Sequence, residues 1–452
     1  MEPGAAEVTR PALTGAQIAS VAAGNALEFY DFITYSFFAV QIGRALFPGD
    51  AAHSLVWSLA TFGIGFISRP VGGLVIGRWA DRRGRKPAMI LSFSLMGVAL
   101  TGLALTPSYA AIGMAAPVFA VLFRLLQGFA LGGEVGPNVA YLVEAAPPNR
   151  RGLYVSFNFA TSDLASLAAG LIGFGLSSVL SNAQLESFGW RIAFLLGAAI
   201  VPFGLRLRRT LAETLPPETA EGEPETRIRP FLVIAFAGML ILGAGTISNY
   251  TLDYLTTDAQ ATLHMPVPAA FGAAIVIGLI SVLCDLGGGW LCDRFGAKRV
   301  LVAPWLLLMV LAVPVFSFLS ATRTAQALLG ATIVLTTLHI LGSTPALILF
   351  VQALPARIRA GAMGFVYAFA IAIFGGTTQL VENALIRWTG NASVPGWYMV
   401  GAVIAGLTGA MLIRQPAVSA GKPCEDAAMN KERADECART ADGASQGGTS
   451  PR

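Results

Sequence analysis

The sequence predicts an all-α membrane protein with twelve transmembrane helices in two six-helix parallel repeats. The first observation is the composition: of 452 residues, 12% are charged and 55% are hydrophobic, with a mean hydropathy of +0.65. A soluble domain carries about 25% charged residues, so lipid is the expected solvent for most of the chain. The other two observations are the number of long apolar segments and an internal repeat. The composition excludes a disordered chain and a disulfide scaffold.

Twelve segments are apolar over the roughly 20 residues that a helix needs to cross the hydrocarbon core of a bilayer. They are residues 18–47, 55–79, 88–107, 111–144, 152–181, 190–208, 231–257, 268–292, 299–320, 325–353, 360–388 and 396–414. The longest polar interruption, the linker at 209–230, divides them six and six. We therefore expect an N-terminal bundle at 18–208 and a C-terminal bundle at 231–414, between a polar leader at 1–17 and a disordered tail at 415–452.

The positive charges indicate which side of the membrane each connection faces. With both termini in the cytoplasm, most lysines and arginines near the span ends fall on the cytoplasmic side, as the positive-inside rule requires. The net charge of +4 is too small to indicate a nucleic-acid partner. The short outer connections leave little room for an extracellular domain.

Short sequence patterns recur between the two halves of the chain. GRWADRRGRKP at 77–87 is echoed by GWLCDRFGAKR at 289–299, and GW at 189–190 is echoed by GW at 396–397. Because the matches keep their order and nearly their offset, we expect two parallel repeats. Secondary transporters have this organisation, with a binding site near the middle of the membrane between the halves.

Two stretches of the first half resemble a known superfamily. The pattern from Gly77 to Pro87 matches the G-x-x-x-D-R-x-G-R-K-P signature of the major facilitator superfamily. Arg124, Gly128 and Gly132 match its R-x-x-x-G-x-x-x-G signature. This resemblance implies the major facilitator fold.

A narrower resemblance concerns the metabolite:proton symporter family. The stretches GNALEFYDF (24–32), SRPVGG (68–73), RLLQGFALGGEVG (124–136) and GWRIAF (189–194) are similar to that family, and most of all to its citrate–proton symporters. The resemblance covers about residues 18–414. It implies proton-coupled transport of a small metabolite.

The signature between the second and third helices places several charges where these helices meet the cytoplasm. We expect a gate that closes the cytoplasmic side in one state, through ion pairs and hydrogen bonds to helix ends. The alternative is that the arginines only set the topology. The expected gate residues are Asp81, Arg82, Arg85 and Glu144, with Asp293 and Arg294 from the second copy of the pattern.

Two carboxyls on the first helix are the predicted proton carriers. Glu28 and Asp31 are three residues apart, so they share one helix face with Tyr35. In a medium of low dielectric they cannot both ionise easily, so one is expected to hold a proton. Arg124 on the fourth helix is the expected opposing cation, for which a substrate carboxylate would compete. A purely structural role for these charges is the alternative.

The remaining site residues are assigned by their place in family-like stretches or by departure from the family. We expect substrate contacts from Asn25, Tyr35 and Arg124, with Arg69 as a weaker candidate, and we group Glu134 with the proton-coupling residues. Asp163 stands where the family usually has an uncharged residue, and Gln379 where it often has proline. The positions of possible specificity are Asp163, Tyr250, Asp253 and Gln379. His339 is expected to be a packed, neutral hydrogen-bonding residue.

The function expected from these observations is secondary active transport. We expect proton-coupled uptake of a small polar metabolite, a di- or tricarboxylate such as citrate, by alternating access. The proton gradient would supply the energy, with no cofactor and no metal. One alternative is an exporter or exchanger of another metabolite or drug on the same fold, and another is a transporter-like membrane sensor.

An enzyme is not expected, because no nucleophile–base set or metal-ligand cluster is present, and the four cysteines lack metal-ligand spacing. The expected partners are the small-molecule substrate, protons and the lipid bilayer of a bacterial inner membrane. The protein is expected to act as a monomer.

Overall fold

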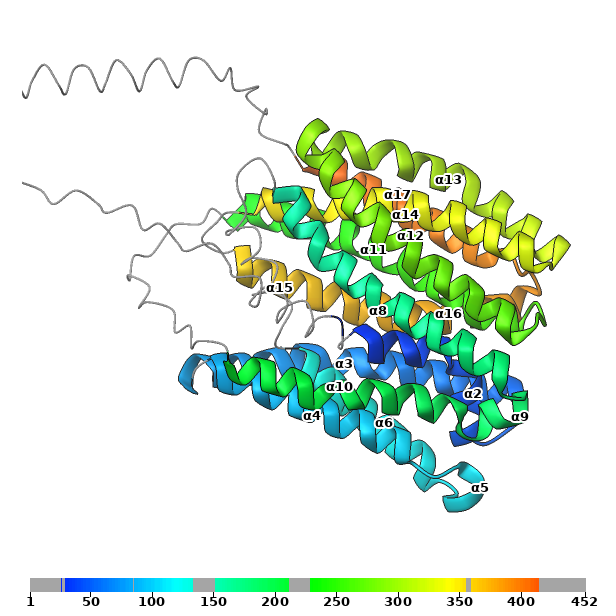
Figure 1. Cartoon of the computed structure of the whole chain (residues 1–452). Helices are drawn as coiled ribbons and strands as arrows, with labels where there is room; N and C mark the ends of the chain where they lie inside the picture. Colours follow the sequence, from blue (N-terminus) through cyan, green and yellow to red (C-terminus); the bar gives the residue numbers. More distant parts are fainter. Residues whose placement is uncertain are drawn as a thin grey trace, which may run out of the picture. The chain divides into compact units, whose positions relative to one another are not determined.

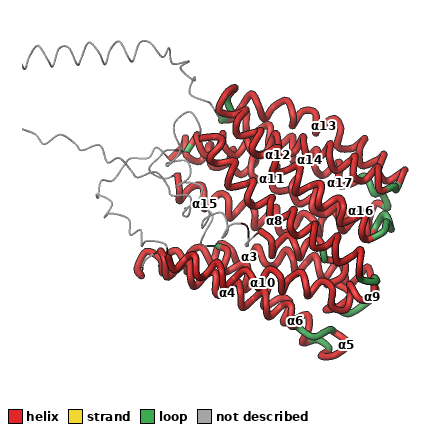
Figure 2. The backbone as a smooth tube through the Cα atoms, viewed as in Figure 1, coloured by secondary structure: helices red, strands yellow, loops and turns green. Residues whose placement is uncertain are grey.

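The structure, a computed structural model, describes residues 26, 29–83, 85–132, 151–210, 228–354 and 359–413. Over these ranges the chain forms helices joined by short turns (Figure 2). Residues 29–37 are helical and lead, after a turn at Phe38, into α2. The elements are α2 (Ala39–Leu46), α3 (Ala51–Arg83), α4 (Arg85–Leu105), α5 (Tyr109–Ile112), α6 (Ala115–Leu131), α8 (Arg151–Val179), α9 (Asn182–Gln184), the π-helical η1 (Leu185–Gly189), α10 (Trp190–Thr210), α11 (Ile228–Ala261), α12 (Val267–Phe295), α13 (Ala297–Thr322), α14 (Ala325–Ala353), α15 (Arg359–Ala370), the π-helical η2 (Ile371–Gly375), α16 (Gly376–Thr389) and α17 (Val394–Leu412).

The helices agree with the expected spans. Within the described ranges, nine helices are long and apolar enough to cross a membrane, and two shorter apolar helices, Ile90–Leu105 and Ala115–Leu131, match the third and fourth expected spans. The first expected span, 18–47, is described mainly from residue 29 onward. The predicted all-α membrane fold is confirmed. The division into two bundles at 209–230 stays a prediction.

The side chains are distributed as lipid solvation requires. Large apolar residues such as Val118, Leu171 and Val310 are exposed on the outer faces of their helices, whereas Asp31 and Arg124 are completely buried. In lipid, every backbone amide and carbonyl must find its partner within the protein, which a helix achieves along its own length. The apolar exterior and the buried charged side chains are therefore both consistent with lipid as the surrounding solvent.

Local signals set several helix ends. The Thr324 side chain accepts a hydrogen bond from the Ala327 amide and caps the start of α14. Gly390, with φ of +66°, ends α16 in the left-handed conformation that glycine adopts without strain. Gly296, with φ of +85°, is the single residue between α12 and α13.

The two halves of the chain meet along two helix pairs, α8 with α12 and α3 with α16 (Figure 1). These pairs correspond under the internal repeat, because the pattern at the end of α3 recurs at the end of α12. At the second pair the backbones touch: a Cβ atom on Gly63 would lie 2.1 Å from the carbonyl oxygen of Gly376. The helices that correspond in the sequence repeat thus also make corresponding contacts, α8 with α12 and α16 with α3.

Glycines also bring α3 and α6 into backbone contact. A Cβ atom on Gly128 would lie 1.7 Å from the Gly65 carbonyl oxygen, and one on Gly132 would lie 1.9 Å from the Arg69 carbonyl oxygen. Small residues at this spacing permit such close contact between helices. It sets the position of Arg69 on α3 relative to Arg124 on α6.

Among the hydrogen bonds that join the halves at the end predicted to face outward, three come from buried or partly buried side chains. Gln41 Nε2 donates to Gln260 Oε1 (2.7 Å), and Thr257 Oγ1 donates to the Ser36 carbonyl oxygen (3.1 Å). Gln379 Nε2 donates to Ser36 Oγ. We refer to these three bonds as the outer contact. They hold the halves together at this end.

Candidate functional site

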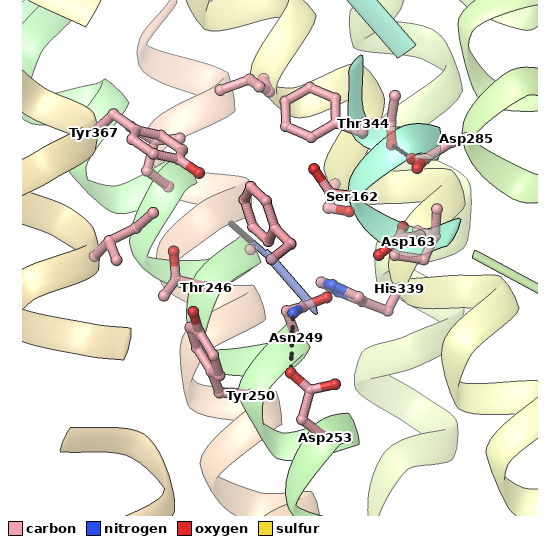
Figure 3. A pocket seen from close by; sticks show the side chains of 18 of the residues that line it. Ser162, Asp163, Thr246, Asn249, Tyr250, Asp253, Asp285, His339, Thr344 and Tyr367 are labelled. Atoms are coloured by element: carbon pink, nitrogen blue, oxygen red, sulfur yellow. Dashed lines mark hydrogen bonds between the residues drawn. The ribbon is translucent and has the colours of Figure 1, made fainter. Parts of the chain in front are cut away.

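A cavity of about 150 Å³ lies between the two halves (Figure 3). The first half contributes residues from the helix at 29–37, α3 and α8, and the second half contributes residues from α11, α12, α14 and α15. Among the described lining residues, the ionisable groups other than tyrosines are Arg69, Asp163, Asp253, Asp285 and His339. A polar cavity between two repeats is the place where transporters bind their substrates.

Arg124 lies in a buried network with Asp31. Arg124 Nη1 donates to Gln127 Oε1 (2.7 Å), and Gln127 Nε2 donates to Asp31 Oδ1 (3.0 Å). Arg124 Nη1 also lies 3.9 Å from Asp31 Oδ2. All three side chains have no exposed surface. The structure therefore brings the predicted Asp31–Arg124 pair together and adds Gln127 as a bridge.

Aromatic rings separate this network from the cavity and connect it to Arg69. The Arg124 guanidinium carbon lies 4.6 Å from the centre of the Phe32 ring and 4.2 Å from that of Tyr35. The Arg69 guanidinium carbon lies 4.4 Å from the same Phe32 ring. One ring therefore contacts both cations, as cation–π attraction favours. Arg69 lines the cavity, whereas Tyr35 is fully buried beside Arg124 and donates to the Ser58 carbonyl oxygen.

Three carboxyls from three helices, Asp163, Asp253 and Asp285, line the cavity; we call them the acidic cluster (Figure 3). Asp163 lies close enough to the other two to act on both electrostatically. Thr344 donates to Asp285 Oδ1, and Asn249 Nδ2 donates to Asp253 Oδ2 at 3.5 Å. The donors of these two hydrogen bonds, a threonine hydroxyl and an asparagine amide, are neutral groups.

On the side of the cavity where the acidic cluster lies, two buried atoms have no hydrogen-bond partner among the described residues. They are Asp285 Oδ2 and His339 Nδ1, and each side chain is only 1% exposed. An unpaired polar group in a buried site costs about 1–3 kcal/mol, so such groups usually have a purpose. Both residues line the cavity, where a ligand can reach them.

The structure separates the predicted site residues into groups. Arg69, Asp163, Tyr250 and Asp253 line the cavity, as substrate or specificity residues would. Gln379 lies instead in the outer contact. Asp285 is recognisable in the sequence as a charge within or near an apolar span, but it has no role in the predicted site.

Other predicted residues fall outside the described part of the chain. Asn25, Glu28, Glu134 and Glu144 are not described, nor are the side chains of Asp81, Arg82 and Arg85. The roles assigned to these seven residues stay predictions.

Asp293 connects the two halves at the end opposite the outer contact. Its carboxylate accepts hydrogen bonds from the backbone amides of Gly152 (2.7 Å) and Leu153 (3.0 Å), at the start of α8. A carboxylate at a helix N-terminus is favoured by the helix dipole. Arg294 is exposed, with its guanidinium carbon 5.5 Å from the Trp290 ring. The contact joins α12 to α8, and the predicted gating role stays a prediction.

Comparison with known proteins identifies the family. Residues 24–377 match the family model described as Major Facilitator Superfamily. The chain belongs to the major facilitator superfamily. It is similar to the crystal structure of a D-xylose–proton symporter, with a TM-score of 0.70 at 17% identity over 88% of this chain and 97% of that one. The fold is therefore the major facilitator fold, as predicted.

The chain is similar to several members of the superfamily over most of their length. The chain is 33% identical to a citrate–proton symporter of Klebsiella pneumoniae, over 86% of this chain and 89% of the relative. It is 33% identical to an alpha-ketoglutarate permease of Escherichia coli (strain K12), over 88% and 93%. A proline/betaine transporter of the same strain is 28% identical over 94% and 88%. The chain is thus a multi-pass membrane transporter and not an enzyme.

Proposed function

We propose that this transporter uses the proton gradient to import a small metabolite that carries a carboxylate. The observation that carries the proposal is the buried Arg124–Gln127–Asp31 network, which shares the Phe32 ring with Arg69 at the cavity. It places an acid that can take up a proton behind a cation that can bind an anionic substrate. The cavity between the halves provides the site that alternating access requires.

Coupling follows from the charges. Asp31 acts electrostatically on both Arg124 and Arg69. When Asp31 is ionised, it offsets part of their positive charge. When Asp31 takes up a proton, that positive charge is uncompensated and attracts a carboxylate in the cavity more strongly. By linkage, a bound carboxylate favours protonation of Asp31 by the same factor.

The names of the relatives do not select one substrate. Those named for citrate and alpha-ketoglutarate support the predicted di- or tricarboxylate, whereas the one named for proline and betaine supports a zwitterion. A carboxylate is common to all of them, and it is the group that we assign to Arg69. We further propose a bacterial inner-membrane location with both termini in the cytoplasm, a monomer, and no cofactor.

The Asp31→Asn variant tests the coupling. Purified protein in lipid vesicles is given an inward proton gradient, and uptake of labelled citrate, 2-oxoglutarate, proline and glycine betaine is measured separately. We expect the wild type to accumulate at least one of them and to lose this accumulation when an uncoupler is added. Asp31→Asn is expected to lose accumulation while retaining exchange of labelled for unlabelled substrate.

Asp50→Asn is the matched control, because Asp50 is exposed and lies outside the cavity and the Arg124 network. It is expected to behave as the wild type. Accumulation by Asp31→Asn at the wild-type level would remove Asp31 from the coupling step. Wild-type uptake that is unchanged at zero gradient would exclude proton-driven import.

A further inference from the structure

The cavity carries more negative than positive groups. Among its described lining residues, the acidic cluster is opposed by one guanidinium, that of Arg69. Within the described ranges, no lysine or arginine forms an ion pair with any member of the cluster. Asp163 is the neighbouring ionisable group of both Asp253 and Asp285. The acidic cluster therefore has no neighbouring positive side chain, among the described residues, to neutralise its carboxylates.

The positive and negative groups occupy different parts of the cavity. Tyr250 is near the positive group, because its ring centre lies 5.5 Å from that of Phe66, and the Arg69 guanidinium carbon lies 4.4 Å from the same Phe66 ring. Figure 3 shows Tyr250 next to Asp253, with Asp163 and Asp285 across the cavity. A ligand that fits this arrangement has a negative group at one end and a positive group at the other.

The apolar part of the lining suits an alkylated cation. Aromatic rings from four residues, Phe29, Phe159, Tyr250 and Tyr367, line the same cavity. The face of an aromatic ring attracts an ammonium group, and combinations of rings and carboxylates recognise alkylammonium ligands. A ligand composed only of carboxylates would gain nothing from this attraction.

We propose that the substrate is a zwitterion, with one carboxylate at Arg69 and one amine or quaternary ammonium within the acidic cluster. The unpaired Asp285 Oδ2 and His339 Nδ1 would then face the cationic group, and an unprotonated Nδ1 can accept a hydrogen bond from an ammonium N–H. The inference rests on the proposed function, which requires only the carboxylate. A citrate trianion would bring further negative charge to a cavity that already holds three carboxyls, at a large electrostatic cost.

Pairs of ligands with one shape and different charge test this inference on the wild type. Glycine betaine is compared with 3,3-dimethylbutanoate, in which carbon replaces the charged nitrogen, and proline is compared with cyclopentanecarboxylate. Affinity for the full chain in lipid nanodiscs is measured by calorimetry, with citrate as a fifth ligand. We expect the zwitterion to bind at least tenfold more tightly than its carbon analogue in one or both pairs, and more tightly than citrate.

The variant Asp163→Asn locates the cationic end. It is expected to weaken binding of the zwitterion at least tenfold and to leave the affinity for its carbon analogue unchanged. Asp258→Asn is the matched control, because Asp258 is a buried aspartate on α11 that is not part of the cavity lining. It is expected to bind both members of a pair as the wild type does.

Two results would overturn the inference: equal affinity within both pairs, or citrate binding more tightly than either zwitterion. Citrate preference would mean that the acidic cluster holds protons and donates hydrogen bonds to an anion. Gradient-driven uptake of citrate would then leave the proposed function intact while the zwitterion is excluded. Selective zwitterion binding without gradient-driven uptake would support the zwitterion as ligand and exclude proton-driven import.

Discussion

Arg124 is a charged side chain with no exposed surface. Its guanidinium group is fully buried, hydrogen-bonds to Gln127, faces Asp31, and contacts the rings of Phe32 and Tyr35. Its Nε and Nη2 atoms have no hydrogen-bond partner among the described residues. A planar, permanently charged group is needed to make ring contacts and a hydrogen bond together. This arrangement explains why a cation can lie in the interior, at a distance from its carboxylate.

The Arg124→Lys variant tests this geometry. A lysine ammonium has no planar face for the rings and cannot reach Gln127 and Asp31 with the same fork of donors. We expect uptake to fall at least tenfold and the apparent melting temperature to drop. Arg206→Lys, at an exposed arginine of α10, is the control and is expected to change neither quantity. Wild-type uptake by Arg124→Lys would show that charge alone is sufficient.

The second residue-scale feature, the acidic cluster, was only partly predictable. Asp163 and Asp253 are predicted from the sequence as positions of possible specificity, and the structure places both at the cavity. Asp285 and His339 are ionisable residues in apolar segments, but the sequence does not show which helix face they occupy. Gln127 was overlooked because an uncharged amide in a span is not unusual by itself.

At the scale of elements, the packing of α3 against α6 controls where the two arginines lie. Backbone contact at Gly65 and Gly128 leaves no space for a side chain between these helices. Arg69 and Arg124 are held at a fixed separation on either side of Phe32 as a result. The glycine pattern in the sequence is therefore a condition for the electrostatic coupling.

Gly128→Ala tests this link. The added Cβ would collide with the Gly65 carbonyl oxygen, so the helices must separate, and we expect a loss of roughly 1–3 kcal/mol of stability, the usual cost of overpacking. Thermal unfolding and uptake are both expected to decline. Gly330→Ala on α14 is the control: no atom lies within 4 Å of the new Cβ, so it is expected to be neutral or to stabilise the helix by up to about 1 kcal/mol. Equal effects of the two variants would contradict this account.

At the scale of the whole transporter, the contacts between halves occur at both ends. The outer contact joins Gln41 to Gln260, and the Asp293 carboxylate joins α12 to the start of α8 at the other end. If both contacts act as gates, alternating access predicts that the outer contact breaks in the outward-open state and the Asp293 contact breaks in the inward-open state. The bonds of the outer contact are few and easily exchanged for water, which suits a gate.

Cross-linking tests whether the outer contact opens during transport. Gln41→Cys and Gln260→Cys are combined in a variant whose four native cysteines are replaced by serine. A short, reducible thiol cross-linker is expected to stop uptake, and reduction is expected to restore it. Each single variant, treated with the same reagent, is expected to keep its activity. Uptake by the fully cross-linked protein would show that this end does not need to open.

The sequence by itself determined the number and order of the helices, the repeat, the superfamily and the Asp31–Arg124 pair. These depend on composition, span length and short motifs, which are local properties of the chain. The tertiary structure decided which charges share the cavity: Asp163, Asp253 and Asp285 come from three distant helices. In a membrane helix the lipid-facing and core-facing sides are both apolar, so periodicity indicates the inward face only weakly. Only the packing of helices against one another decides which polar side chains meet.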